Sequence, residues 1–376
     1  MILTHLFKDF FSSERAGGMV LIVCTIFSLA LTNFYPAYHE LWQVEIQGHH
    51  LTHWINDGLM TIFFLLIGLE LEREIYAGEL SSVKNALLPV IAAVGGMIIP
   101  ACLYLVFNND QNVRGFGIPM ATDIAFAIGV LSLLGKRVTV SLKVFLTAFA
   151  VIDDLGAILV IAVFYTNNLN FVYLAIAAGI LIFLFVLNRL KVNVLWPYIV
   201  GGFFLWYCML SSGVHATLAG VLLAFVIPFG SGDEKSISYT CQKALHWPVA
   251  FVILPLFALA NTSFFIPQDL QSVLTSPISI GVAVGLMIGK PIGIFAFSYL
   301  SVKLKITSLP PDSKWSHIFG AGILGGIGFT MSIFISLLAF EDVAKVDQAK
   351  IAIMAASLIA GILGILYLRT ALRQTS

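Results

Sequence analysis

The chain has 376 residues, of which 59% are hydrophobic and only 11% are charged. A soluble protein of this length could not bury so much apolar surface in its core, so the composition predicts a membrane protein. The formal net charge is zero, which gives no indication of a nucleic-acid partner. The four cysteines show neither metal-ligand nor redox spacing, and no cofactor is expected.

Apolar stretches long enough to cross a bilayer recur along the whole chain, and they predict an all-α polytopic membrane protein with twelve transmembrane helices. The predicted spans lie near residues 17–35, 57–71, 86–107, 117–135, 144–166, 171–188, 195–210, 214–228, 248–265, 278–300, 317–340 and 349–368.

The charges of the connecting loops predict the orientation. If both termini are cytoplasmic, sixteen of the twenty Lys and Arg residues lie on the cytoplasmic side. Three, Arg114, Lys345 and Lys350, then lie outside, and Lys290 falls within a span. An excess of Lys and Arg inside is typical of membrane proteins, so both ends are expected in the cytoplasm.

The first external loop, residues 40–56, differs from the others. Trp42, Val44 and Ile46 alternate with polar residues before a Gln47-Gly48 turn, a pattern that predicts a short β-hairpin. The edge of such a hairpin is a surface for pairing with another chain. A compact loop that covers the helix ends is the alternative interpretation.

Two spans carry residues that interrupt a helix. Pro119, Thr122 and Asp123 fall in the fourth span, and the eleventh, FGAGILGGIGFTMSIF, has glycines at 320, 322, 325, 326 and 328. Each interrupted span is the middle one of three consecutive spans. The two sets of three spans lie near residues 86–166 and 278–368, and they start on opposite sides of the membrane. Interrupted segments at matching places in inverted-topology repeats indicate a transporter site, with two broken helices that cross at the midplane.

Ionisable residues within the spans form the candidate site. Asp153 and Asp154 are adjacent in the fifth span, where even one carboxylate costs about 3 kcal/mol to insert. Such a pair could hold protons at low pH and a hard cation at higher pH, because two close carboxylates do not both ionise easily. Asp123 could balance the positive ends of the broken helices and Lys290 the negative ends, while Thr122 supplies a neutral oxygen.

An acidic stretch, GLELEREIY, ends the second span. Its residues Glu70, Glu72, Arg73 and Glu74 are expected either to form a solvated face or to form an acidic cytoplasmic mouth that attracts cations.

Six motifs together resemble the NhaA-type Na⁺/H⁺ antiporter family over nearly the whole chain. They are TDIAFAIGVLSLLG, AVIDDLGAI, SGVHATLAGV, LPLFALAN, GKPIGIF and GGIGFTMSIFI, in that order, and GLELEREI in the second span adds to them.

The resemblance implies one transmembrane transporter domain over residues 1–376. In it the two repeats form a core, and the remaining helices form an interface part with a dimerising hairpin at 40–56. It implies an electrogenic, multi-pass exchanger of the bacterial inner membrane that exports Na⁺ or Li⁺ for H⁺ by alternating access, for pH and sodium homeostasis.

The resemblance also assigns roles to residues. Asp153, Asp154 and Thr122 match the ion- and proton-binding residues, and Asp123 matches the broken-helix site. Lys290 matches the buried lysine that pairs with the first aspartate. A glutamate and a histidine before the ninth span are associated with pH response in the family; here Gln242 and Lys243 stand at those places and only His246 fits the pattern.

Two other classes of function remain open. An intramembrane aspartyl protease also needs two aspartates within the membrane, and Asp123 with Asp153 could supply them from separate helices. No GxGD stretch occurs, however, and the buried lysine would have no role. A sodium-dependent symporter of an organic anion could be built on the same repeats.

Overall fold

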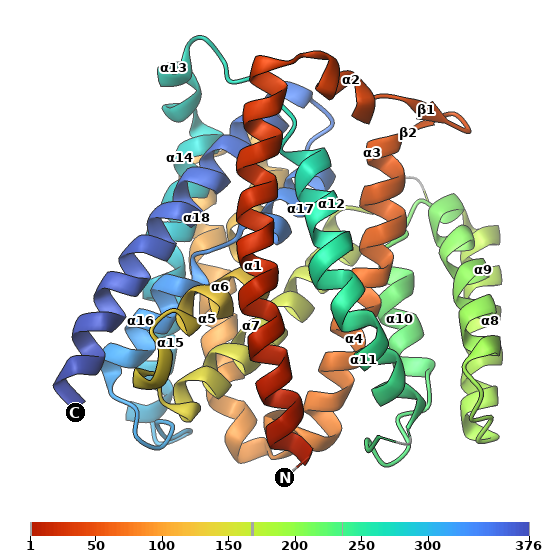
Figure 1. The fold of residues 1–376 in the computed structure, drawn as a ribbon, viewed down its shortest axis with the longest axis horizontal. Coiled ribbons are helices and arrows are strands. Elements are labelled where there is room, and N and C mark those ends of the chain that lie inside the picture. Colours follow the sequence, from red (N-terminus) through yellow and green to blue (C-terminus); the bar gives the residue numbers. More distant parts are fainter. Residues whose placement is uncertain (1, 167–168, 235, 376) are drawn as a thin grey trace. The chain divides into compact units, whose positions relative to one another are not determined.

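Helices make up most of the computed structural model, which describes residues 2–166, 169–234 and 236–375 (Figure 1). Where no water is available, an α-helix pairs every backbone N–H and C=O within its own segment, so apolar runs of this length fold as helices. The helices divide into two units. The first comprises the described residues of Met1–Ile26, Ser82–Ala157 and Phe264–Ser376, and the second comprises Phe27–Ser81 and Ile158–Ser263.

The first unit contains the second predicted repeat and most of the first, whose last residues, 158–166, belong to the second unit. Its helices are the first part of α1 (Ile2–Phe34), α5 (Val83–Phe107), α6 (Ile124–Ser132), most of α7 (Val140–Phe164), α13 (Leu270–Leu274), α14 (Pro277–Val284), α15 (Lys290–Lys303), α16 (Trp315–Gly325), α17 (Phe329–Ala339) and α18 (Val343–Ala371). A 3₁₀ helix, Asp110–Met120, precedes α6, and a π-helical turn, Gly285–Gly289, joins α14 to α15.

Within this unit, α5 and α15 approach each other at two glycines. A Cβ atom at Gly95 would overlap the carbonyl oxygen of Gly293, and a Cβ atom at Gly293 would overlap that of Gly95. Small residues permit such backbone contact between helices in a membrane. Since Lys290 lies one turn before Gly293, this close contact fixes the part of α15 from which the lysine side chain extends.

The second unit contains the remaining helices and the strands. They are the end of α1, α2 (Ala37–Trp42), β1 (Glu45–Ile46), β2 (His49–His50), α3 (Leu51–His53), α4 (Met60–Ala77), the end of α7, α8 (Phe171–Arg189), α9 (Trp196–Ser212), α10 (Leu218–Val226), α11 (Ile237–Pro248) and α12 (Leu254–Asn261). Two π-helical turns, Trp54–Leu59 and Val249–Ile253, lead into α4 and α12.

The predicted hairpin is present. β1 and β2 pair antiparallel, with Glu45 opposite His50 and Ile46 opposite His49. Gln47 and Gly48 form the turn with φ angles of 53° and 82°, the left-handed conformation that a two-residue hairpin turn of this kind requires.

Nine helices in the described ranges are long and apolar enough to cross a membrane, or ten if the bent pair α16 and α17 counts as one span. The predicted spans near 195–210 and 214–228 correspond to α9 and α10, which have 17 and 9 residues and are too short for this criterion. The predicted span near 214–228 begins too early, because Gly213, at φ 83°, ends α9 and the chain turns before Leu218.

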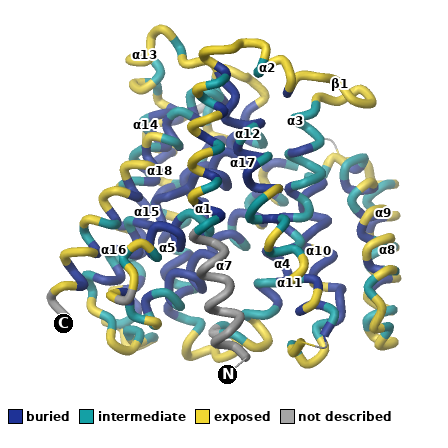
Figure 2. Tube along the Cα trace, in the orientation of Figure 1, coloured by how far each residue is buried: buried dark blue, intermediate teal, exposed yellow. Residues whose placement is uncertain are grey.

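The surface of α8 indicates its surroundings. Only 11% of its most apolar stretch is buried, and Figure 2 shows most of the helix as exposed or intermediate. Phe183 and Phe185 are among its exposed side chains. Large apolar side chains on the outside of a helix that is long enough to span a bilayer are expected to face lipid.

Candidate ion-binding site

The two adjacent aspartates lie in the interior of the first unit. Both are on α7, and Asp153 and Asp154 are 0% and 1% exposed. Successive residues of an α-helix point about 100° apart, so the two carboxylates face different neighbours. A buried carboxylate that remains charged needs a cation or hydrogen-bond donors beside it.

Lys290 supplies a cation to Asp153. Its Nζ atom lies 2.5 Å from Asp153 Oδ2 and 2.8 Å from Thr122 Oγ1, and all three residues are completely buried. The lysine begins α15 directly after the π-helical turn Gly285–Gly289, a kind of irregularity that is frequent at functional sites. The pair is therefore a buried ion pair in which removing one partner leaves the other charge uncompensated.

The two predicted helix breaks are present and contact each other. Residues 121–123 separate the 3₁₀ helix from α6, and residues 326–328 separate α16 from α17. The Asp123 N–H donates to the carbonyl of Ile327 at 2.7 Å, and the Thr122 hydroxyl donates to the carbonyl of Gly325 at 2.9 Å. Each break thus satisfies backbone groups that the other leaves unpaired, which unwound chain requires where water is excluded.

Asp123 lies at the N-termini of two helices. Its Oδ1 accepts the N–H of Phe126 in α6 at 2.9 Å, and its Oδ2 accepts the N–H of Thr330 in α17 at 3.1 Å. The Thr330 hydroxyl also donates to Oδ2, at 2.5 Å. A carboxylate in this position offsets the positive ends of both helix dipoles.

Lys290 is connected to the negative C-terminal end of α16 through Thr122. The Lys290 ammonium contacts Thr122 Oγ1, and the same hydroxyl donates to the carbonyl of Gly325, the last residue of α16. Thr122 therefore links the ion pair to the second break.

Sequence reasoning did not identify Thr330 as part of this cluster. A signal was available, since Thr330 follows the last glycine of the eleventh span by two residues, and Thr122 follows Pro119, which interrupts the fourth span, by three.

The residues of the predicted cytoplasmic mouth belong to the second unit. Glu70 is hydrogen-bonded to Gln242, one of the two positions that depart from the family pattern, and it interacts electrostatically with Arg73 and Glu74. His246 is partly buried on α11.

The expectation of a solvated face is wrong for Glu72. It is buried, and its carboxylate accepts the Ser238 hydroxyl at 3.2 Å. The helix α4 presents this side chain to α11 rather than to solvent.

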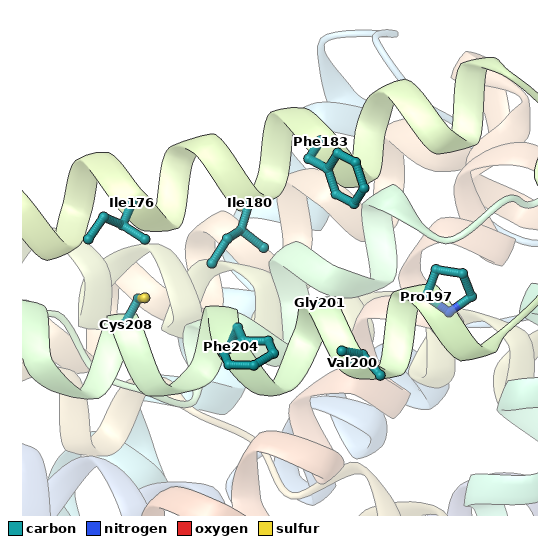
Figure 3. A pocket seen from close by; sticks show the side chains of 8 residues that line it. All are labelled: Ile176, Ile180, Phe183, Pro197, Val200, Gly201, Phe204 and Cys208. Carbon is teal, nitrogen blue, oxygen red and sulfur yellow. The ribbon is translucent and has the colours of Figure 1, made fainter.

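A groove of about 400 Å³ lies elsewhere in the second unit, between α8 and α9 (Figure 3). It contains no charged residue and has no chemistry for binding a cation. Its lining is Ile176, Ile180, Phe183, Pro197, Val200, Gly201, Phe204 and Cys208.

Comparison with known proteins supplies a family for this arrangement. The family described as Na+/H+ antiporter 1 matches residues 8–368. The Na(+)/H(+) antiporter NhaA 1 of Flavobacterium johnsoniae is 60% identical over 372 residues, which cover 98% of each chain. The Na(+)/H(+) antiporter NhaA of Cytophaga hutchinsonii is 58% identical over 377 residues, covering 100% of this chain and 97% of that protein.

A more distant relative shows the same extent of similarity. The Na(+)/H(+) antiporter NhaA of Dechloromonas aromatica is 54% identical over 373 residues, which cover 97% of this chain and 96% of the relative. Because the family and these relatives match nearly the full length, the chain belongs to the Na+/H+ antiporter 1 family.

Proposed function

We propose that this multi-pass membrane protein is an electrogenic antiporter that exports Na⁺, or Li⁺, in exchange for H⁺. The observation that carries the proposal is the buried pair Asp153 and Asp154, of which Asp153 is neutralised by Lys290. Relatives at 58% and 60% identity carry the name Na(+)/H(+) antiporter, and they match from end to end. The exchange needs no cofactor, since protons and cations are themselves the substrates.

The chemistry follows from competition for the same oxygens. A protonated carboxylate cannot bind Na⁺, so the carboxylates of Asp153 and Asp154 hold either protons or the cation. Thr122 and freed backbone carbonyls supply neutral oxygens, the ligand type that hard cations prefer. When Asp153 accepts Na⁺, the Lys290 ammonium is displaced from it, because the single negative charge of one buried carboxylate does not compensate two cations.

Alternating access completes the cycle. Asp153 and Asp154 release protons to the cytoplasm and bind Na⁺ there, and the core then turns the site outward, where protons replace Na⁺. If two protons exchange for one Na⁺, one net charge crosses per cycle, and the membrane potential drives export.

The architecture proposed for this cycle is the twelve-span form with inverted repeats. It places both termini in the cytoplasm and the chain in the bacterial inner membrane. The second repeat, most of the first and both helix breaks belong to the first unit, which supports its role as the moving core. Glu70, Arg73, Glu74 and His246 are proposed as a cytoplasmic mouth or pH-responsive group, and the hydrogen bond between Glu70 and Gln242 supports that proposal.

The protease alternative fits the site poorly. A shared water between two aspartates needs both carboxylates to face it. Here Asp153 faces Lys290, while both oxygens of Asp123 accept hydrogen bonds from helix N-termini.

The test uses everted membrane vesicles with a respiration-driven proton gradient that is followed by a fluorescent dye. Na⁺ or Li⁺ should collapse the gradient in the wild type, and the apparent KM for Na⁺ should fall as pH rises, because fewer protons compete. Asp154→Asn should insert normally but lose exchange by at least about a hundredfold, since it loses both the charge and the proton site. Asp342→Asn, at the exposed start of α18, is the matched control and should exchange normally.

Three outcomes would contradict the proposal. Full exchange by Asp154→Asn would remove the assigned role of the pair. No collapse by any cation, with the protein present in the membrane, would favour sodium-dependent uptake of an organic anion or peptide cleavage instead. Rates that do not change with a clamped membrane potential would exclude the stoichiometry of two protons per Na⁺.

A further inference from the structure

The Lys290 ammonium faces an aromatic ring in addition to its two oxygen partners. Its Nζ atom lies 5.5 Å from the centroid of the Phe149 ring. A cation within about 6 Å of an aromatic ring is attracted by the negative face of the ring, and the attraction is strongest where water is excluded. Phe149 and Lys290 are both completely buried.

The helix places this ring beside the ion pair. Phe149 is four residues before Asp153 on α7, so the two side chains lie on the same side of the helix. The ammonium therefore meets a carboxylate and an aromatic ring of one helix, together with the Thr122 hydroxyl from the first break.

The ring itself has little freedom. A Cβ atom at Gly96 would lie 3.2 Å from Phe149 Cε2, and one at Gly325 would lie 3.3 Å from Cε1. Any side chain at these two glycines would press on the ring, so the glycines provide the space that it fills. Phe145 stacks one turn earlier at a centroid distance of 6.5 Å. The ring is thus a fixed surface, whereas the lysine has a long flexible stem.

We propose that Phe149 is a positioning residue, which holds the Lys290 ammonium when Asp153 exchanges its lysine partner for Na⁺. This inference rests on the proposed sodium/proton exchange. Once Na⁺ occupies Asp153, the hydroxyl of Thr122 and the ring of Phe149 still contact the ammonium, and the Asp154 carboxylate still attracts it electrostatically. The lysine keeps its proton in this step and only changes its contacts.

The direction of the effect follows from the cost of a buried charge. An ammonium without partners in the interior is strongly unfavourable. While the Asp153 carboxylate neutralises the ammonium, it also weakens the attraction between the ammonium and the ring, so that attraction is larger once the ion pair has separated. The ring thereby makes it easier for Na⁺ to displace the lysine. Without it, Lys290 competes more strongly with Na⁺, and a higher Na⁺ concentration is needed.

Substitution by leucine tests this first. At fixed pH, Phe149→Leu should raise the KM for Na⁺ about tenfold and change kcat by less than about twofold. Because leucine also alters the packing at Gly96 and Gly325, a second series is needed in which the shape stays nearly constant.

That series replaces Phe149 with phenylalanine carrying one, two or three ring fluorines. Each fluorine withdraws electron density from the ring face and changes its size little, so KM should rise stepwise with the number of fluorines. The same series at Phe145 is the matched control. Phe145 is buried on the same helix and stacks on Phe149, and KM should stay constant there.

The outcomes separate this inference from the proposed function. If the wild type shows no exchange, the proposed function fails whatever the Phe149 variants do. If the wild type exchanges and KM stays flat across the series at Phe149, or rises equally at Phe145, the positioning role alone is overturned.

Discussion

Asp123 is the residue on which the geometry of the two breaks depends. It accepts three hydrogen bonds, two from backbone N–H groups at different helix starts and one from the Thr330 hydroxyl. Asp123→Ala should lower the free energy of unfolding by about 3 kcal/mol, because it leaves these donors buried and removes the charge that offsets two dipoles. Asp123→Asn keeps one acceptor oxygen, so its free energy of unfolding should lie between those of the wild type and Asp123→Ala. Thermal unfolding in detergent measures the relative stabilities of the wild type and the two variants.

A second aspartate that caps a helix, Asp342, provides the control. Asp342 caps α18 by accepting the N–H of Ala344 at 2.9 Å, but it is exposed and serves one helix. Asp342→Ala should cost about 1 kcal/mol. Equal losses of stability for the alanine variants of Asp123 and Asp342 would show that Asp123 acts as an ordinary cap.

At this scale, residue type identifies the ionisable groups within the apolar spans more readily than it identifies their partners. Two carboxylates in an apolar span are conspicuous whatever the fold, and burial cost alone marks Asp153 and Asp154. The pairing of Lys290 with Asp153 came from the family resemblance. The contacts of Thr330 and Phe149 depend on the exact way in which separate helices cross, which residue type alone does not determine.

At the scale of elements, the interruptions were predictable from local chemistry. Pro119 lacks a backbone donor, and glycine is a poor helix former, so the breaks before α6 and before α17 follow from residue types. The π-helical turn Gly285–Gly289 was not predicted, since its glycines are equally compatible with an α-helix. Its position depends on tertiary packing, where a Cβ at Gly285 would contact Pro119 and a Cβ at Gly289 would contact Pro100.

The contact between α5 and α15 can be tested through its glycines. Gly293→Ala places a methyl group against the Gly95 carbonyl and forces the helices apart, which should lower the free energy of unfolding by about 2 kcal/mol. Because Lys290 is on α15, exchange should fall as well. Gly179→Ala on α8 is the control, since no atom lies within 4 Å of a Cβ there. It should leave stability unchanged or slightly higher, and a loss equal to that of Gly293→Ala would contradict the packing argument.

At the scale of the whole molecule, hydropathy separates helices from loops but does not decide how many helices cross. The SGVH turn illustrates the limit, because its apolar neighbours extended a predicted span to residues that form no helix. The division into two units does not follow from composition. The expectation of a core beside an interface part rests on the family resemblance alone.

The hairpin leads to a prediction about assembly, namely that two copies pair through residues 40–56. β1 and β2 form a two-stranded sheet whose residues are all exposed, and Val44 and Ile46 are 49% and 46% exposed. Edge strands with exposed apolar side chains favour pairing with another chain. Ile46→Asp should therefore shift the protein from dimer to monomer in detergent, as measured by light scattering after size-exclusion chromatography.

The control for assembly must be equally apolar but lie outside the hairpin. Val343 at the start of α18 is 72% exposed, and Val343→Asp should leave the mass unchanged. Since the carboxylate cluster and both breaks belong to one unit of one chain, monomeric Ile46→Asp should retain Na⁺-dependent exchange. A monomeric wild type would exclude the hairpin interface in detergent. A monomeric variant without exchange would instead show that the site depends on assembly, although each chain contains all of its residues.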